Sequence, residues 1–390
     1  MIRIRTITYN LPAVVTDSTF RQIEVCSKLF SGIKYEVHTQ RISCTPTGKP
    51  DTAFISELSD FCKSSGVRWF NVPLDIWDGQ KSTNEDITNL LVQHDNAFVN
   101  ILCAKNGATK DSVLDFTARQ FLINGQNDKE GLINFRFGGT MNVAPFGPFF
   151  PFTYSGGDAS LSFSIGLEIA EEVNDILKDS ENELNVYANR IVQTLEPQIA
   201  EIESIAEQIS RETGVPFKGI DFSLAPLPKE NNSVITVLNS LGVRSINDTG
   251  AMFATAFLTR LLKSFTKTHK SVGFSGVMYS LIEDMVYAED NNRLGFSIDR
   301  MIALSTMCGC GCDMVPVPLE TPVEKIKTVM LEIACVSSRL QKPLGVRLLP
   351  VESTDSFTHF LGEADFCVNT RLVELNTENS FSFTGDYSFI

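Results

Sequence analysis

The chain has 390 residues, of which 43% are hydrophobic, and a formal net charge of −14. This length and apolarity exclude a disordered protein, because such a chain can bury a large core. The acidic balance argues against nucleic acid or an anionic membrane as the main partner, since both attract clustered lysine and arginine. The sequence has no run of about 20 uncharged apolar residues, so we expect no membrane-spanning helix.

The cysteine pattern bears on the cellular compartment. Nine cysteines, an odd number, are spread along the chain without the spacing of a disulfide framework. Such usage is typical of a reducing environment, so we expect a cytoplasmic protein. The N-terminus is predicted as a strand and not as a signal peptide.

The first 145 residues alternate strand and helix signals. Residues 2–9 alternate apolar and polar side chains as a strand does, and residues 19–30 have the three-four spacing of a helix. We predict further strands at 35–43, 67–72, 97–103 and 133–143, and further helices at 52–64, 86–93 and 111–122. This order predicts a mostly parallel sheet in an α/β fold.

A turn-rich stretch at 144–159 precedes a long helical segment, which we place at 161–211. Its apolar residues recur three and four positions apart, and glutamates occupy the other face. Pro197 either kinks this segment or starts a second helix. The pattern fits two core-packing helices with acidic solvent faces, or a coiled-coil interface with a partner.

Beyond residue 211 the alternation resumes. Strands are predicted at 215–225, 344–349 and 366–375, and helices at 234–241, 251–265 and 322–340. No linker divides the chain, so residues 1–390 are predicted as one large α/β unit. A polar stretch at 379–390 is predicted as a loose tail.

The most unusual segment is Cys308-Gly309-Cys310-Gly311-Cys312-Asp313, where thiols alternate with glycines. Glycine permits a tight turn and a close backbone approach. A catalytic thiolate here would need a nearby cation, metal or helix N-terminus to lower its pKa. A zinc site is less well supported, because the sequence contains no second cysteine pair. The third interpretation is a buried glycine turn with small cysteine side chains.

Other segments carry further candidate residues. A glycine loop that ends at Asn142 could present backbone N–H groups to an anion, or simply lead to an N-capped helix. Asp221 interrupts an apolar strand, where a carboxylate requires a partner or a function. Arg347 also lies in an apolar strand and needs an anionic partner, either a carboxylate such as Asp313 or a ligand.

Two neighbouring carboxylates are candidate metal ligands, and four histidines are candidates for a catalytic triad. Glu283 and Asp284 could ligate Mg²⁺ or Ca²⁺, although a solvated helix face is the commoner explanation. The histidines, at 38, 94, 269 and 359, are scattered, and none stands beside a serine or cysteine motif. The sequence therefore predicts no histidine-based triad.

Four segments, taken together, carry a family resemblance. The first is Asn142-Val143 with Pro148-Phe149-Phe150-Pro151 and Tyr154, then Ser162-Phe163-Ser164-Ile165-Gly166-Leu167-Glu168. The second is Gly219-Ile220-Asp221-Phe222-Ser223-Leu224-Ala225-Pro226, and the third is Gly273-Phe274-Ser275-Gly276-Val277-Met278 with Glu283-Asp284. The fourth is Cys308-Gly309, Gly311, Asp313, Val315-Pro316 and Pro318, then Lys342-Pro343-Leu344 with Arg347. In this order the segments resemble the uncharacterised bacterial and archaeal family named domain of unknown function 711. The N-terminal part is similar to the family through weaker motifs.

The resemblance implies a fold like that of pyruvate formate-lyase. That fold is a large α/β barrel of two parallel half-sheets with a loop threaded into its centre. Cys308 would then lie on the central loop as the analogue of the active cysteine, with Asp313 and Arg347 close to it. The glycyl-radical signature of those enzymes is missing near the C-terminus, so we expect no glycyl radical. Cys310 and Cys312 depart from the family pattern, which leaves Cys308 as the matching thiol.

These expectations favour a non-radical enzyme that acts on a small carboxylated or phosphorylated metabolite in a pocket at the barrel centre. The predicted catalytic residues are Cys308, Asp313 and Asp221, the predicted ligand-binding residues are Arg347, Asn142, Ser223 and Ser275, and the predicted metal ligands are Glu283 and Asp284. The alternative is a non-catalytic metabolite-binding or regulatory protein that works with a small ACT-domain protein, a partner that the resemblance implies. A homo-oligomer is expected, and an oligomeric scaffold built on 161–211 is a third interpretation.

Overall fold

The computed structural model describes residues 1–79, 82–128, 130–178, 183–352, 366–375 and 384–389. Its strands are β1 (Arg3–Asn10), β2 (Gln40–Ser43), β3 (Trp69–Leu74), β4 (Ala97–Lys105), β5 (Ala108–Thr109), β6 (Phe137–Met141), β7 (Ser162–Glu168), β8 (Phe217–Asp221), β9 (Gly311–Pro318), β10 (Leu344–Val351) and β11 (Tyr387–Ser388). Its α-helices are α1 (Asp17–Ser31), α2 (Thr52–Ser65), α3 (Asn84–Gln93), α4 (Asp111–Asn127), α5 (Leu132–Phe135), α6 (Ala170–Lys178), α7 (Leu184–Thr213), α8 (Val234–Ser240), α9 (Ala251–Phe265), α10 (Met285–Leu294), α11 (Ile298–Ser305) and α12 (Val323–Leu340). Two short 3-10 helices are η1 (Glu230–Asn232) and η2 (Leu281–Glu283). None of the helices in these described residues combines the length and apolarity that a bilayer crossing requires.

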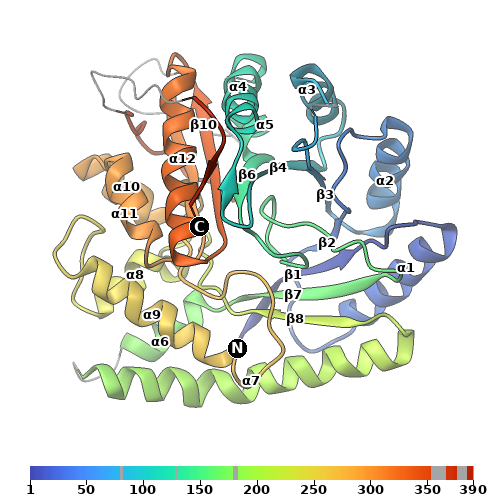
Figure 1. The fold of residues 1–390 in the computed structure, drawn as a ribbon. Helices are drawn as coiled ribbons and strands as arrows, with labels where there is room; N and C mark the ends of the chain where they lie inside the picture. Colours follow the sequence, from blue (N-terminus) through green and yellow to red (C-terminus); the bar gives the residue numbers. More distant parts are fainter. Residues whose placement is uncertain (80–81, 129, 179–182, 353–365, 376–383, 390) are drawn as a thin grey trace.

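The strands that the structure describes belong to one mixed sheet. Its main path runs β8-β7-β1-β2-β3-β4-β6-β10-β9. The central strands β1, β2, β3, β4 and β6 are parallel to one another. At one end β7 and β8 run together against β1, and at the other β9 and β10 run together against β6. The predicted α/β class with a large, mostly parallel sheet is confirmed (Figure 1).

The described strands leave this sheet open between β8 and β9. The segment 271–280 lies between these two edges and forms isolated parallel bridges in place of a continuous ladder. It bridges Ile220 and Leu224 on the β8 side and Asp313 in β9. The model thus contains a mixed sheet whose edges share one irregular segment, and the predicted closed barrel stays a prediction.

A short aromatic segment, 148–153, contacts strands that are far apart in the sheet. A Cβ at Gly166 in β7 would lie 3.0 Å from the Phe149 ring, and one at Gly345 in β10 would lie 2.6 Å from the Phe152 ring. The same short segment therefore meets two strands that stand six places apart in the sheet order, and glycine at both positions allows the close approach.

The cysteine turn lies where a helix meets an edge strand of the described sheet. It joins α11 to β9, and Gly309 lies against the backbone of Gly276 in the segment 271–280. Cys310 belongs with Phe149 and Phe152 to a small buried apolar cluster, whereas Cys308 and Cys312 belong to the main core. The predicted central position of this loop depends on the closed barrel and stays a prediction.

The helices lie around the outside of the curved sheet, and α7 runs along its lower side in the view of Figure 1. Helix α7 is a single helix of 30 residues that contains Pro197 within it. The apolar face of this helix is buried against the rest of the same chain. Its buried residues are Tyr187, Ile191, Leu195, Ile199, Ile202, Ala206 and Ile209. This burial accounts for the apolar stripe that also fitted a coiled-coil interface.

Several predicted elements differ from the structure: residues 366–375, predicted as a strand, form none, and the strand predicted at 133–143 begins with α5. Two further differences concern the long helical segment and the tail. Residues 162–168 form β7, so the helical segment predicted at 161–211 begins later, with α6 and α7. The alternation of Ser162, Phe163, Ser164 and Ile165 has the period of a strand, and the helical interpretation overlooked it. In the predicted loose tail, β11 pairs with β5, while residues 379–383 and 390 lie outside the described residues.

Candidate functional site

A cavity of about 320 Å³ gathers four arginines beside a set of aromatic rings. The arginines are Arg5, Arg41, Arg68 and Arg347. Strands of both directions contribute to it: Arg5 and Arg41 come from β1 and β2 of the central parallel set, and Arg347 comes from the antiparallel β10. His38 and Glu283 also line it. We call this hollow the Arg41 cavity.

Arg41 is the most unusual cation of this cavity. Its side chain is buried, with 6% of the residue exposed, and it forms no ion pair with a carboxylate among the residues that the structure describes. Its Nε donates to Thr39 Oγ1 at 3.0 Å, and its guanidinium lies over the rings of Trp69 and Phe150. Burial, together with the nearby charge of Arg5, holds the pKa of Arg41 well below its ordinary value.

Arg347, in contrast, donates four hydrogen bonds to groups of the protein itself. Its Nε lies 2.6 Å from Asp313 Oδ1 and its Nη2 lies 2.9 Å from Asp313 Oδ2. The same Nη2 donates to Glu283 at 3.1 Å, and Nη1 donates to the Phe135 carbonyl at 2.9 Å. Of the two partners expected for Arg347, the carboxylate is the one found. The predicted pair of Asp313 and Arg347 is therefore real, and it supports the wall of the cavity.

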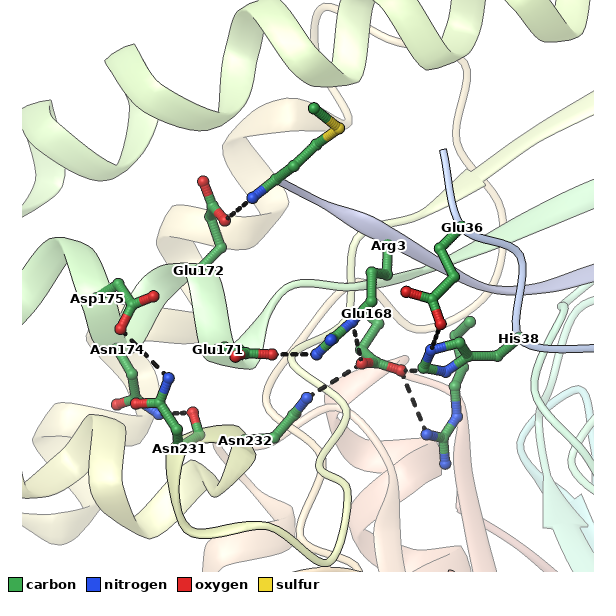
Figure 2. Close-up of polar contacts among 12 residues, drawn as sticks. Arg3, Glu36, His38, Glu168, Glu171, Glu172, Asn174, Asp175, Asn231 and Asn232 are labelled. Atoms are coloured by element: carbon green, nitrogen blue, oxygen red, sulfur yellow. Dashed lines mark hydrogen bonds and ion pairs between the residues drawn. The ribbon is translucent and has the colours of Figure 1, made fainter. Parts of the chain in front are cut away.

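Glu168, at the end of β7, is the buried anion beside this cavity. It accepts from Arg3 Nε at 2.9 Å, Asn232 Nδ2 at 3.1 Å and His38 Nδ1 at 2.8 Å, an arrangement that Figure 2 shows. Burial opposes ionisation, but the hydrogen bond from His38 and the charges of Arg5 and Arg3 outweigh it, so the pKa of Glu168 is lowered. Glu168 is therefore a fixed negative charge.

His38 lies between two carboxylates at the cavity wall. Nδ1 faces Glu168, and Nε2 lies 3.2 Å from Oε1 of the exposed Glu36 (Figure 2). A carboxylate that holds one ring nitrogen fixes the orientation of the imidazole. His38 thus has the geometry of an oriented proton donor or acceptor, although its sequence context had predicted no such role.

Asp221, Ser223 and Ser275 lie close together, but they are buried outside the Arg41 cavity and bind backbone amides. Asp221 Oδ1 accepts from the Ser223 and Ser275 amides at 2.9 and 3.0 Å, and Oδ2 accepts from the Phe274 amide at 2.7 Å. Ser223 Oγ donates to Asp221 and accepts from the Gly276 amide. Burial raises the pKa of Asp221, and these donors oppose the rise. The trio joins β8 to the segment 271–280.

The adjacent acids Glu283 and Asp284 face different surroundings. Glu283 lines the Arg41 cavity and accepts from Ser280 Oγ at 2.5 Å as well as from Arg347. Asp284 caps α10 by accepting from the Tyr287 amide at 3.1 Å, and its other oxygen accepts from the Val234 amide at 2.8 Å. Burial raises the pKa of Asp284 to about 6. Among the described residues no group of three His, Cys, Asp or Glu could hold a metal ion, so the Mg²⁺ or Ca²⁺ site stays a prediction.

The Cys308 thiol is fully buried and is not among the residues that line the Arg41 cavity. A hydrogen bond from Cys310 and the charge of Lys342 lower the pKa of Cys308 to about 6 against the effect of burial. The Lys342 ammonium donates to the carbonyls of Ser305 and Cys308, which ties the turn to the start of β10. The buried glycine turn fits this geometry, and Lys342 is a nearby cation of the kind that the thiol interpretation required.

Asn142 lies apart from these groups, beside a second hollow of about 640 Å³. Its side-chain oxygen accepts from the Gly107 amide at 2.9 Å, and its nitrogen donates to Ser337 and Ser338 at 3.0 Å each. These bonds join the end of β6 to the last turns of α12. The side-chain amide of Asn142 thus has partners within the chain, and its predicted ligand role stays a prediction.

The sequence matches a known protein family over nearly its whole length. The model of the family described as "Uncharacterised ACR (DUF711)" matches residues 3–357. The chain belongs to this family. The predicted membership is confirmed, whereas the relation in fold to pyruvate formate-lyase stays a prediction.

Curated relatives carry the name "UPF0210 protein". One from Pyrobaculum arsenaticum is 30% identical over 230 residues, which cover 55% of this chain and 49% of the relative. One from Oleidesulfovibrio alaskensis is 26% identical over 280 residues, which cover 68% of this chain and 61% of the relative. The matched part therefore spans about half the length of the Pyrobaculum relative.

Sequence reasoning missed Arg5, Arg41, His38 and Glu168. The signal that singled out Arg347, a charged residue inside an apolar strand, also applies to Arg41 between Gln40 and Ile42. His38 was set aside because no nucleophile adjoins it in the sequence, but its partner Glu168 lies 130 positions away. Their meeting depends on the pairing of β1 with β7, which the sequence interpretation did not contain.

Proposed function

We propose that this chain binds a small metabolite through a carboxylate or phosphate group in the Arg41 cavity and acts on it as a non-radical enzyme. The observation that carries the proposal is the buried Arg41 guanidinium, which has no carboxylate partner among the described residues. Removing an unpaired charge from water costs several kcal/mol, about 3–5 when a buried pair loses one partner. An anionic ligand would offset that cost.

The other charged residues of the cavity also support Arg41 as the group that binds the anion. Arg347 is neutralised by Asp313 and Glu283, and Arg5 faces Glu168 and Glu283. Arg41 is therefore the guanidinium whose hydrogen-bonding edge is open to a ligand within the described part of the chain. Arginine binds carboxylate and phosphate through paired, charge-assisted hydrogen bonds, which fix the orientation of the ligand.

His38 is the residue that we propose for proton transfer. It lines the Arg41 cavity, and Glu168 holds its Nδ1 at 2.8 Å. General acid-base catalysis requires that a ring nitrogen reach the substrate, so Nε2 would exchange its contact with the exposed Glu36 for the ligand. Cys308, Asp221 and Asn142 do not line this cavity, so the proposal gives them no contact with the ligand.

The architecture that we propose is the pyruvate formate-lyase-like ring. The central parallel strands and the oppositely directed pairs at each end support it, since 271–280 bridges both open edges in parallel. The segment would then act as the missing strand. A solved structure with a continuous ladder on both sides of 271–280 would support the ring, and a wide gap there would contradict it.

The experiment is a thermal-shift panel of small carboxylates and phosphates, followed by product detection by NMR. A ligand at 100 times its Kd stabilises the folded state by about 2.7 kcal/mol. We expect such a stabilisation in the wild type and its loss in Arg41→Met. His38→Gln should retain binding within a few-fold and lose turnover. A panel without any stabilising anion would contradict the proposal.

Binding without turnover defines the second candidate function. It describes a regulatory metabolite-binding protein, for which an ACT-domain partner remains the predicted companion. The wild type would then be stabilised by the anion, no product would form, and His38→Gln would behave as the wild type. The open donor edge of Arg41 supports this candidate as well as the enzyme, and His38 beside it favours the enzyme.

A further inference from the structure

The charges around the Arg41 cavity constrain the charge of its ligand. Arg5 and Arg347 face Glu168, Glu283 and Asp313 at distances between 2.6 and 4.0 Å. Arg68 stacks on the Trp69 ring at 4.2 Å and has further interactions of its own. Arg41 has no carboxylate within ion-pair distance among the described residues. A single negative charge balances it, while a phosphate dianion would place a second charge near Glu283 and Glu36.

The walls of the cavity constrain the body of the ligand. Five aromatic side chains line it, Trp69, Phe98, Phe135, Phe150 and Phe366. They form a contiguous group, with centroid distances of 5.4 Å from Trp69 to Phe98, 5.3 Å from Phe98 to Phe135 and 4.8 Å from Phe135 to Phe366. Val37 and Leu227 extend this apolar surface. Such walls favour a ring or a branched hydrocarbon over a polar sugar.

The size of the cavity limits the ligand further. Its volume of about 320 Å³ lies near the lower end of the roughly 300–1,000 Å³ that is typical of small-molecule sites. A single ring with a short acidic side chain fits within such a volume.

We infer that the natural ligand is a monocarboxylate with an aromatic or branched hydrocarbon body. This inference rests on the proposed function and narrows it. The carboxylate accepts two hydrogen bonds from Arg41, and the body packs on the rings. His38 then lies beside the bound acid, where it can exchange a proton with the carbon or oxygen next to the carboxylate.

The test is isothermal titration calorimetry with a matched set of probes. Phenylacetate and 4-methylvalerate carry the predicted charge and body, acetate carries the charge alone, and phenyl phosphate carries the body with a dianion. We expect the first two to bind at least tenfold more tightly than acetate and phenyl phosphate. Arg41→Met should abolish this binding, and Arg41→Lys should weaken it at least tenfold because the fork of donors is lost.

A second variant tests the apolar body separately from the charge. Leu227 is half-buried at the cavity wall, so Leu227→Trp should fill part of the hollow without removing a charge. It should weaken phenylacetate at least tenfold and leave acetate within twofold. The surface variant Arg119→Met is the control and should bind all probes as the wild type does.

The outcomes separate the two levels of the proposal. Tight binding of phenyl phosphate or inorganic phosphate through Arg41, without binding of phenylacetate, would overturn the monocarboxylate inference and leave the anion site standing. Equal binding of acetate and phenylacetate would overturn the role of the aromatic wall. Binding that survives Arg41→Met would overturn the proposed site itself.

Discussion

Arg347 and Asp313 form a two-point ion pair in the buried interior, with Nε–Oδ1 and Nη2–Oδ2 distances of 2.6 and 2.9 Å. Burial acts against the charged guanidinium, but Asp313 and Glu283 outweigh it and raise the pKa of Arg347. The residue predicted as a ligand anchor thus donates four hydrogen bonds to the protein itself, and its predicted ligand role stays a prediction. Its neutralisation leaves the neighbouring Arg41 as the group that can receive an anion.

Removing Asp313 should be strongly destabilising. Asp313→Ala leaves Arg347 buried and deprived of its main partner, which costs about 3–5 kcal/mol. The measurement is the free energy of unfolding from urea titration. Glu283→Ala is the comparison and should cost less, because that carboxylate is partly exposed and contributes a single bond to Arg347. Equal losses in both variants would contradict the two-point role of Asp313.

Arg41 should behave in the opposite way. Arg41→Met replaces a buried unpaired charge by an apolar side chain of similar length, so we expect stability to rise by about 1 kcal/mol or more. The surface variant Arg119→Met should change stability by less than about 0.5 kcal/mol. Urea titrations of the ligand-free proteins measure both. A loss of stability in Arg41→Met would mean that Arg41 supports the fold and not a ligand.

The contrast between these two arginines explains what the sequence could reveal. Period-two and three-four patterns predicted the α/β class, and an arginine in an apolar strand correctly marked Arg347 as paired or functional. Which arginine keeps its donors free depends on whether a carboxylate from another strand reaches it. Asp313 lies 34 positions before Arg347, and no pattern along the chain encodes that meeting or its absence at Arg41.

Other predicted residues carry backbone roles that sequence alone could not separate from chemistry. Asp221 is buried because it accepts bonds from the amides of the segment 271–280, and a catalytic carboxylate in an apolar strand would have given the same signal. The mistaken helical start at 161 has another cause. Buried residues of β7 such as Ile165 and Leu167 also fit the helical spacing of the segment that follows.

Asp284 gives the fold a dependence on pH. Its pKa is about 6 in the folded protein, against about 3.9 for an ordinary aspartate. The folded state therefore binds the proton more tightly, and stability falls as pH rises from about 4 to about 6, by roughly 3 kcal/mol in total. Urea midpoints across this range should lose that component in Asp284→Asn. An unchanged slope in the variant would assign the pH dependence to other groups.

The Cys308 thiol should be dispensable for ligand binding. It does not line the Arg41 cavity, so Cys308→Ala should leave the Kd of a bound carboxylate within twofold. In the wild type, iodoacetamide should label the exposed Cys335 well before the buried Cys308, despite the lowered pKa of the latter. A tenfold loss of affinity in Cys308→Ala would place the thiol in the site after all.

The most direct test of the account is the position of a heavy-atom anion in a crystal of the wild-type protein. Crystals soaked in 4-iodobenzoate should give an anomalous peak inside the Arg41 cavity, with the carboxylate oxygens within hydrogen-bonding distance of the Arg41 guanidinium. An ordered structure in which that cavity stays empty, while the anion occupies other surfaces, would contradict the claim that Arg41 is held open for a ligand.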